Sequence, residues 1–221
     1  MAVQTEGKYL GDWLKWEQES CFSRKVITIL AGSGAARILT TGMVLGAITK
    51  GAATAAAVAG NTGTGTIGAI TVGAAAKPGV YRLTCIEPAT DAGKFQVEDP
   101  DGIVVGVATV AVAFSGGGLG FTISDATDFV AGDSFTITVA AGSGKFVQID
   151  DDGTNGSEDA AGILLMNVTA PDGVDAVAVA IVRDAKVSAS GITWPSDFDT
   201  NEKAAATAQL AALGIIVEEA A

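Results

Sequence analysis

Short apolar runs, most of them alternating with polar residues, follow one another from residue 67 to residue 141. Side chains of a strand point alternately to its two faces, so a period of two predicts half-buried strands. Turn residues such as Pro100-Asp101-Gly102 separate the runs at the spacing of a small β-sandwich or barrel. The predicted strands lie in GAITVG (68–73), GVYRLTCIE (79–87), GKFQVED (93–99), GIVVGVATV (102–110), VAFS (112–115), LGFTIS (119–124) and DSFTITVA (133–140).

Strand-like runs also flank this segment on both sides. KVITILA (25–31) and MVLGAIT (43–49) precede it. KFVQI (145–149), GILLMNVTA (162–170) and AVAVAIVRDAKV (176–187) follow it, with Pro171-Asp172-Gly173 as the turn between the last two. GIIVEEA (214–220) is a terminal strand.

One helix is predicted, close to the C-terminus. Asp199 is the expected N-cap, and Glu202 stands three residues later, as in a capping box. The run EKAAATAQLAAL (202–213) has high helix propensity, and Gly214 ends it in a C′ position. Ala206, Leu210 and Leu213 share a face.

The composition changes abruptly after Lys50, to an Ala/Gly/Thr-rich stretch that is typical of a linker, with a short helix over its alanines as the alternative. AAGSGK (140–145) forms a second linker. We therefore expect a mainly β (α+β) protein in which residues 51–144 form an inserted β-sandwich-like domain with flanking linkers. Residues 25–50 and 145–221 would form one discontinuous β-rich body that carries the helix, preceded by an arm over residues 1–24.

Aromatic residues are concentrated in this N-terminal arm, which is otherwise polar. Tyr9, Leu10, Trp13, Leu14 and Trp16 fit neither a helical nor an alternating pattern throughout. Two interpretations stay open on these residues alone: the arm packs on its own domain, or it docks on another chain.

Charge narrows the range of partners. The formal charge is −12 and the isoelectric point is about 4.2, so phosphate backbones and anionic lipids would repel the protein. Two uncharged stretches, 51–76 and 102–124, are broken by Gly and Thr, which argues against membrane helices. No secretory leader is visible, so we expect synthesis in a cytoplasm, with Cys21 and Cys85 as free thiols in a reducing compartment.

Chemical motifs are weak. The chain has no histidine, which removes the commonest general base, the Ser-His and Cys-His dyads and the usual zinc ligand. GTGTIG, GSGK and GSGAAR each lack the context of a phosphate-binding loop. The acidic stretch FVQIDDDGTNGSEDAAGILL (146–165) does not fit a calcium loop in either register, so we interpret it as a surface turn. We expect no enzyme activity, no cofactor and no metal.

Joined across the predicted insertion, the outer halves resemble the head-decoration proteins of lambda-like tailed bacteriophages. The matching stretches are EGKYLGDWL, FSRKVITI and TTGMVLGAIT in the first half and DGTNGSEDAAGILLMNV, AVAVAIVRDAKV and AAATAQLAALGIIV in the second. The resemblance covers residues 6 to about 50 and 145 to 219. Residues 51 to 144 have no counterpart in the compact members.

The resemblance implies a structural protein that forms a homotrimer on the outer capsid surface at three-fold sites and stabilises the expanded head. It also implies an N-terminal arm that adds a strand to the major capsid protein. The expected capsid-binding side chains are Tyr9, Leu10, Trp13, Leu14, Trp16 and Phe22. An alternative role is recognition of a host-surface ligand by the inserted domain.

Overall fold

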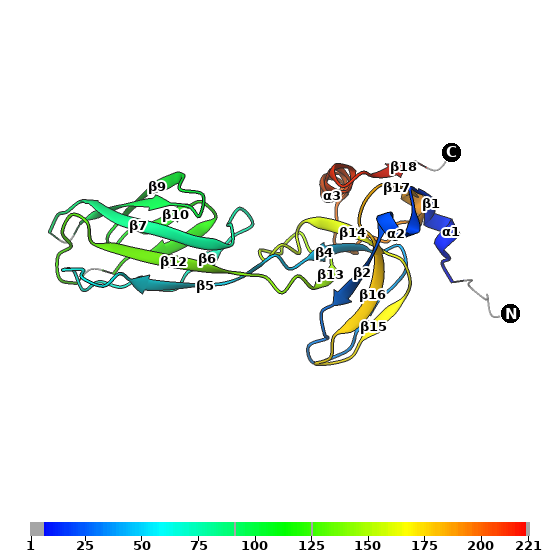
Figure 1. Cartoon of the computed structure of the whole chain (residues 1–221), viewed down its shortest axis with the longest axis horizontal. Helices are drawn as coiled ribbons and strands as arrows, with labels where there is room; N and C mark the ends of the chain where they lie inside the picture. The colour runs from blue at the N-terminus through cyan, green and yellow to red at the C-terminus, as the bar shows by residue number, and fades with distance from the viewer. Residues whose placement is uncertain (1–6, 91, 125, 220–221) are drawn as a thin grey trace. The chain divides into compact units, whose positions relative to one another are not determined.

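The computed structural model describes residues 7–90, 92–124 and 126–219, and the chain divides into two compact units. Unit 1 comprises Met1–Ile48 and Gly144–Ala221, and unit 2 comprises Thr49–Ser143. Both consist mainly of strands, and the only helix longer than four residues in the described chain lies near the C-terminus (Figure 1). The predicted fold class is therefore confirmed.

Five strands of unit 1 close into a barrel in the order β13-β2-β16-β14-β4. They are β2 (Arg24–Ile29), β4 (Val44–Ala47), β13 (Phe146–Gln148), β14 (Ala160–Leu164) and β16 (Ala176–Ile181). β2 and β16 pair antiparallel along their whole length, while β13 pairs in parallel with β2 and antiparallel with β4. β2 and β4 precede unit 2 in the chain and the other three strands follow it, so the barrel needs both parts of unit 1.

Two smaller sheets complete the strands of unit 1. In the first, β17 (Ala185–Ser188) lies between the antiparallel β1 (Leu14–Glu17) and the parallel β18 (Ile215–Glu218). In the second, β3 (Arg37–Leu39) pairs antiparallel with β15 (Val168–Ala170). The runs 162–170 and 176–187 each contain two strands where the apolar pattern suggested one. Asp184, at a positive φ of 42°, separates β16 from β17.

The predicted helix is α3 (Thr200–Ala212), with the expected caps. The Asp199 carboxylate accepts hydrogen bonds from the backbone N–H groups of Asn201 (2.6 Å) and Glu202 (2.9 Å), and the Glu202 side chain bonds back to the Asp199 N–H. Gly214 follows the helix at a φ of +77°, a conformation that glycine adopts without strain. Leu210 on its inner face is fully buried.

Unit 1 contains two hydrophobic clusters, one within the barrel and one between the barrel, α3 and the β1–β17–β18 sheet. The first is built around Ile27, Ile29, Leu45, Leu164 and Ala180, and the second around Trp13, Ile163, Val187, Leu210 and Ile215. The inward positions of β2 alternate with outward ones, as a period of two requires.

Unit 2 is a β-sandwich of a five-stranded sheet, β5-β12-β7-β8-β9, and a three-stranded sheet, β10-β11-β6. Its strands are β5 (Lys50–Ala57), β6 (Thr71–Val72), β7 (Gly79–Glu87), β8 (Lys94–Glu98), β9 (Val104–Thr109), β10 (Ala113–Gly116), β11 (Leu119–Thr122) and β12 (Ser134–Ala141). Each of the seven strand-like runs predicted between residues 67 and 141 overlaps one of them, and β5 is the eighth strand.

The core of unit 2 belongs to this unit alone. Its six aromatic residues are all buried, and neighbouring rings such as Phe95 and Phe129 meet edge to face at 5.0 Å between centroids. The six are Tyr81, Phe95, Phe114, Phe121, Phe129 and Phe135. Each of the three clusters of buried residues in the described part of the chain lies within one unit.

The stretch after Lys50 is a strand, so its interpretation as a linker or short helix is wrong. β5 pairs antiparallel with β12, and Ala53 and Ala55 turn toward the core. Alanine has little strand propensity of its own, and here the backbone pairing with β12 decides the conformation. The loop after β5 is also fixed, because the buried Asp133 carboxylate accepts hydrogen bonds from Thr62 N (2.9 Å) and Gly63 N (2.8 Å).

Candidate functional site

The N-terminal segment of unit 1 folds as a helical turn, α1 (Leu10–Trp13), followed by strand β1 and a second turn, α2 (Ser20–Ser23). Asp12 starts the first turn, because its carboxylate accepts a hydrogen bond from Tyr9 N (2.7 Å) while its own N–H donates to Tyr9 O (3.1 Å). β1 is then held by antiparallel pairing with β17. The residue pattern alone did not decide between a helix and a strand for this segment. The structure contains both, a helical turn over Leu10–Trp13 and then a strand over Leu14–Glu17.

Trp13 is completely buried in unit 1. Its indole nitrogen donates a hydrogen bond to Thr41 Oγ1 at 3.0 Å. Gly191 lies so close that an added Cβ would stand 2.4 Å from Trp13 Cβ and 2.6 Å from Trp13 Cα, so only glycine leaves room for the chain at Trp13. Leu10 and Leu14 pack beside it, half-buried. These three of the six predicted docking residues therefore pack on their own unit.

The other three predicted docking residues are exposed. The exposed fractions are 60% for Tyr9, 51% for Trp16 and 44% for Phe22. Trp16 lies directly opposite Lys186 on β17. The guanidinium of Arg183 lies over the Phe22 ring at 5.2 Å from its centroid, in a cation–π arrangement. The segment thus combines an anchored part, around Trp13, with an aromatic part open to solvent.

A shallow groove lies where the N-terminal segment meets the barrel. It measures about 320 Å³ and is lined by Lys8, Tyr9, Leu10, Thr41, Leu165, Met166 and Asn167. Lys8 is fixed at one side by hydrogen bonds from its ammonium group to Gly191 O (2.8 Å) and Thr193 Oγ1 (2.7 Å). Most of the exposed lining is apolar, which suits a hydrophobic side chain of a partner better than a polar ligand.

Several exposed residues beside these aromatics were not predicted. Val26 on β2 and Val177 on β16 are 68% and 73% exposed, on two strands that pair with each other. The strict alternation of AVAVAIV (176–182) does place Val177 and Val179 on the face opposite Ala178 and Ala180, a signal that was available in the sequence. No sequence pattern indicates Arg183, because its contact with Phe22 joins residues far apart in the chain.

Two ion pairs link elements of unit 1, one between β1 and β2 and the other just before β13 and β16. Arg24 binds Glu17 through two hydrogen bonds, at 2.6 and 2.9 Å, and this contact raises the pKa of Arg24. Lys145 pairs with Asp175 at 2.6 Å, and this bond, with a second from Ala31 N, lowers the pKa of the Asp175 carboxyl.

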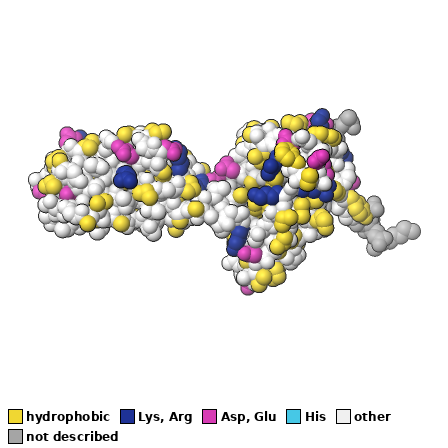
Figure 2. Space-filling view, in the orientation of Figure 1, with side chains coloured by type: hydrophobic (Ala, Val, Ile, Leu, Met, Phe, Trp, Pro, Cys, Tyr) yellow, Lys and Arg dark blue, Asp and Glu magenta, His cyan; other side chains and the backbone are white. Residues whose placement is uncertain are grey.

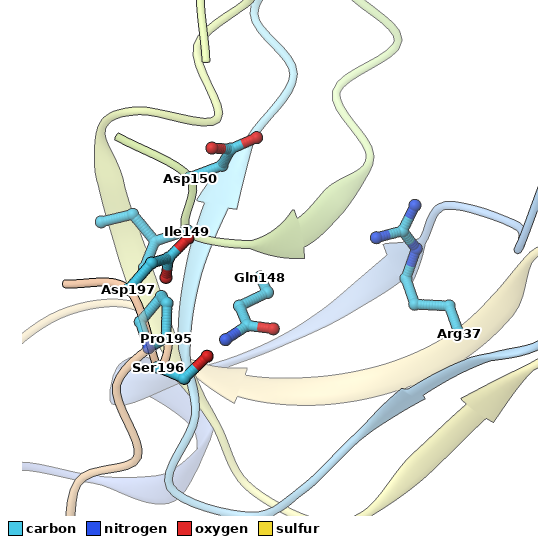
Figure 3. A pocket seen from close by; sticks show the side chains of 7 residues that line it. All are labelled: Arg37, Gln148, Ile149, Asp150, Pro195, Ser196 and Asp197. Carbon is cyan, nitrogen blue, oxygen red and sulfur yellow. The ribbon is translucent and has the colours of Figure 1, made fainter. Parts of the chain in front are cut away.

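A second, polar pocket of about 360 Å³ is lined by Arg37, Gln148, Ile149, Asp150, Pro195, Ser196 and Asp197 (Figure 3). In Figure 3, Arg37 lies across the pocket from Pro195 and Asp197. Arg37 Nε donates to Leu30 O at 3.1 Å, which holds the guanidinium at this side of the pocket. The pocket offers a guanidinium, two carboxylates and a hydroxyl, and the histidine that commonly activates such a hydroxyl does not occur in the chain.

The acidic stretch after β13 forms a tight turn. Gly153 N donates to Asp150 O (3.0 Å), Asp150 N donates to Ser157 O (3.0 Å), and the Ser157 side chain is buried beneath the turn. Within residues 7–90, 92–124 and 126–219, no three His, Cys, Asp or Glu side chains gather as a metal site would need. In the same ranges no helix has the length and apolar character needed to cross a membrane.

Both cysteines are free thiols. Cys85 is buried in unit 2, where burial raises the pKa of its thiol. Cys21 is exposed in α2 and donates to Glu19 Oε2 at 3.3 Å.

Comparison with known proteins identifies the family. A search of curated proteins found no match. Among solved structures, the chain is similar to FlgL of Xanthomonas campestris, with 24% identity and a TM-score of 0.32 over 46% of this chain and 33% of that one. It is also similar to the flagellar hook junction protein FlgK of Burkholderia pseudomallei, with 27% identity and a TM-score of 0.31 over 56% of this chain and 21% of that one.

The chain spans a third or less of the length of these flagellar proteins, and with TM-scores this low we draw nothing from the likeness. The family model of bacteriophage lambda head decoration protein D, in contrast, matches residues 3–215. That match extends over nearly the whole chain, so the resemblance found in the sequence is confirmed. The chain belongs to the head-decoration family of phage capsid proteins, whose members are structural and not enzymatic, and its place is on the virion capsid.

Proposed function

We propose that the protein binds the outer surface of the phage head as a homotrimer at three-fold sites and stabilises the expanded shell through contacts of its N-terminal segment with the major capsid protein. One observation carries the contact: Tyr9, Trp16 and Phe22 are exposed on a short segment whose remaining large apolar residues are packed. Burying a large apolar side chain at an interface contributes about 1.5–3 kcal/mol to the free energy of binding. These three side chains can therefore supply a large share of the binding free energy.

Backbone pairing adds to this contact. In the described chain β1 is the edge strand of the β1–β17–β18 sheet, so one side of its main chain has no strand partner. An extended segment of the capsid protein can add to such an edge, where main-chain hydrogen bonds give affinity and side-chain pockets give specificity. Trp16 lies on this strand and is the side chain best placed to fill a pocket beside it.

We place the self-association surface on β2 and β16. Val26 and Val177 are the two most exposed large apolar residues of these strands, and they face outward from the barrel. Figure 2 shows hydrophobic side chains gathered over this part of unit 1. Three copies joined here would present three N-terminal segments to the shell at once, and effective concentration then multiplies a modest single contact.

Unit 2 is in our proposal an insertion into the decoration body, since the strands of unit 1 close their barrel across it. Its second possible role, recognition of a host-surface ligand, has one supporting feature, namely a core independent of unit 1. All six aromatic side chains of unit 2 are buried, so they leave no stacking platform for a sugar. Capsid decoration is therefore the better supported function.

The test uses expanded heads from a phage that lacks the decoration gene, to which purified full-length protein is added. Deleting residues 1–20 would remove Trp13 from the core, so surface substitutions are the sharper tool. We expect a Tyr9→Ser, Trp16→Ser, Phe22→Ser variant to lose head binding and to remain a trimer. Its matched control replaces three exposed aliphatic residues of unit 2, Ile86, Ile103 and Val112, by serine.

A second experiment measures the oligomeric state of the free protein by sedimentation. The double variant Val26→Lys, Val177→Lys should be monomeric, whereas Val130→Lys in unit 2 should remain a trimer. Full head binding by the aromatic variant would remove the N-terminal segment from the docking mechanism. Wild-type protein that fails to bind expanded heads under all conditions would refute the function itself.

A further inference from the structure

Charge is unevenly distributed over unit 1. Residues 14–26 and 183–186 carry five basic and three acidic residues, whereas the rest of unit 1 carries four basic and fourteen acidic residues. The basic residues of the first group are Lys15, Arg24, Lys25, Arg183 and Lys186. In a chain with a formal charge of −12, a region of net positive charge is a feature that needs an explanation.

Hydrogen bonds join the two segments into one continuous surface. Trp16 and Lys186 are directly paired on β1 and β17. Gln18 N donates to Asp184 O at 3.2 Å, and the Ser23 hydroxyl donates to the same carbonyl at 2.9 Å. Figure 2 shows lysine or arginine side chains beside hydrophobic ones over the region that Figure 1 labels α2, β2 and β16. We call this region the α2 surface and define it by Trp16, Phe22, Lys25, Arg183 and Lys186.

Among the described residues, two cations of the α2 surface have no carboxylate partner. Arg24 is neutralised by Glu17, and Lys186 pairs with Glu218 at 2.9 Å. Arg183 and Lys25 are exposed, and neither forms an ion pair with any residue in the described part of the chain.

Arg183 is also held in position. Its guanidinium lies over the Phe22 ring, which restrains the side chain before any partner arrives. A guanidinium held in this way can still bind a carboxylate through two hydrogen bonds from its N–H groups. A restrained donor loses less entropy on binding than a mobile one. Lys25, three residues after Phe22 on strand β2, adds a second positive charge.

We propose that the α2 surface docks on an acidic patch of the partner protein, where carboxylates pair with Arg183 and Lys25 while Trp16 enters an apolar pocket. This inference rests on the proposed capsid docking and names the chemistry of the shell's side of the contact. Charge complementarity explains how a strongly acidic subunit approaches in one orientation: the rest of unit 1 is repelled by the same carboxylates that attract the α2 surface.

The dependence on salt follows directly. An attraction between exposed charges weakens with ionic strength, since the Debye length falls from about 10 Å at 0.1 M to about 3 Å at 1 M salt. A neutral shell surface would leave binding insensitive to salt, whereas a basic one would also lose affinity with salt but would bind Arg183→Glu and Lys25→Glu more tightly than wild type. Wild-type binding to expanded heads should therefore weaken as sodium chloride is raised across this range.

The variants are Arg183→Glu, Lys25→Glu and, as a control with the same change in net charge, Lys203→Glu on α3. Binding of each full-length protein to decoration-free expanded heads is measured at low and at high salt. We expect Arg183→Glu and Lys25→Glu to lower the affinity on the order of tenfold at low salt and to reduce its salt dependence, with Lys203→Glu close to wild type. Lys25→Glu leaves the Phe22 contact intact, so a loss of affinity in this variant cannot come from misfolding around that ring.

Four outcomes are distinguishable. Loss of affinity in both α2-surface variants and not in the control supports the acidic partner. Binding by both variants at the wild-type level, or wild-type binding that is insensitive to salt, overturns it and leaves capsid docking standing. Failure of the wild type to bind heads refutes the docking function together with this inference. Tight wild-type binding to a DNA duplex that Arg183→Glu abolishes would reassign the surface to phosphates.

Discussion

The Trp13 indole nitrogen donates to Thr41 Oγ1 at 3.0 Å, and the same hydroxyl donates to Leu165 O at 2.8 Å. This chain of hydrogen bonds ties the N-terminal segment to the loop before β4 and to the end of β14. Every polar atom in it is buried and satisfied, so the segment is part of the folded unit and not a free tail. A partner that binds the exposed face of β1 therefore meets a surface that is already ordered.

Removing this indole should unfold unit 1 more easily. Trp13→Ala deletes a completely buried aromatic residue and should lower the free energy of unfolding by about 3–5 kcal/mol. Trp13→Phe keeps an aromatic ring and loses one hydrogen bond, while Thr41 keeps its bond to Leu165, so we expect a smaller loss of about 1–2 kcal/mol. Urea unfolding followed by circular dichroism measures both. Trp16→Ala is the control and should stay within about 0.5 kcal/mol of wild type.

Period-two patterning was sufficient to find most of the strands. Runs such as GVYRLTCIE coincide with β7 because their alternation reflects one buried and one open face. β5 was missed, because alanine and glycine carry little local preference and the pairing partner Phe135 lies far along the chain. β3 and β15 are three residues each, too short for a periodic signal. Local chemistry did suffice for α3, whose cap residues act on their immediate neighbours.

The candidate site was only partly accessible from sequence. An excess of aromatic residues near the N-terminus indicated the segment, but spacing alone did not separate Trp13, which is buried, from Trp16, which is exposed. That distinction depends in part on Gly191, which lies far along the chain and leaves room for the main chain and Cβ of Trp13. The contact between Arg183 and Phe22 likewise exists only once β16 and β17 are in place.

The two units should unfold in separable steps. Each has its own hydrophobic core, so a core substitution in one should leave the other intact. Phe95→Ala removes a fully buried ring from unit 2 and should shift one calorimetric transition of the full-length protein downward, whereas Trp13→Ala should shift the other. One transition that both substitutions lower by the same amount would mean that the units unfold together.

The N-cap of α3 contributes a defined amount of stability. Asp199→Ala leaves the N–H groups of Asn201 and Glu202 without their side-chain acceptor, at a cost of about 1 kcal/mol, within the range of 0.5–2 kcal/mol for such caps. Thermal unfolding of the unit 1 transition measures the effect. Asp197→Ala, an exposed substitution two residues earlier, serves as the matched control.

Acid should destabilise unit 2 through Asp133. Burial favours the neutral form of this carboxyl, but hydrogen bonds from the backbone N–H groups of Gly63, Thr62 and Val130 outweigh burial and lower its pKa. A carboxyl whose pKa is lower in the folded than in the unfolded state stabilises the fold at pH values above its unfolded-state pKa, which is near 4. This contribution is lost as the pH falls through the folded-state pKa.

The free energy of unfolding of unit 2 should therefore decline from about pH 5 downward, with Asp99 adding to the effect because Lys77 lowers its pKa as well. Asp133→Asn keeps the size of the side chain but turns an amide donor toward backbone donors. It should cost about 1–3 kcal/mol at neutral pH and flatten the acid slope. Urea unfolding from pH 7 to pH 3 gives both quantities, and Glu87→Gln, in an exposed ion pair with Lys94, should change neither. A slope that remains unchanged in Asp133→Asn would assign the acid sensitivity to other carboxyls.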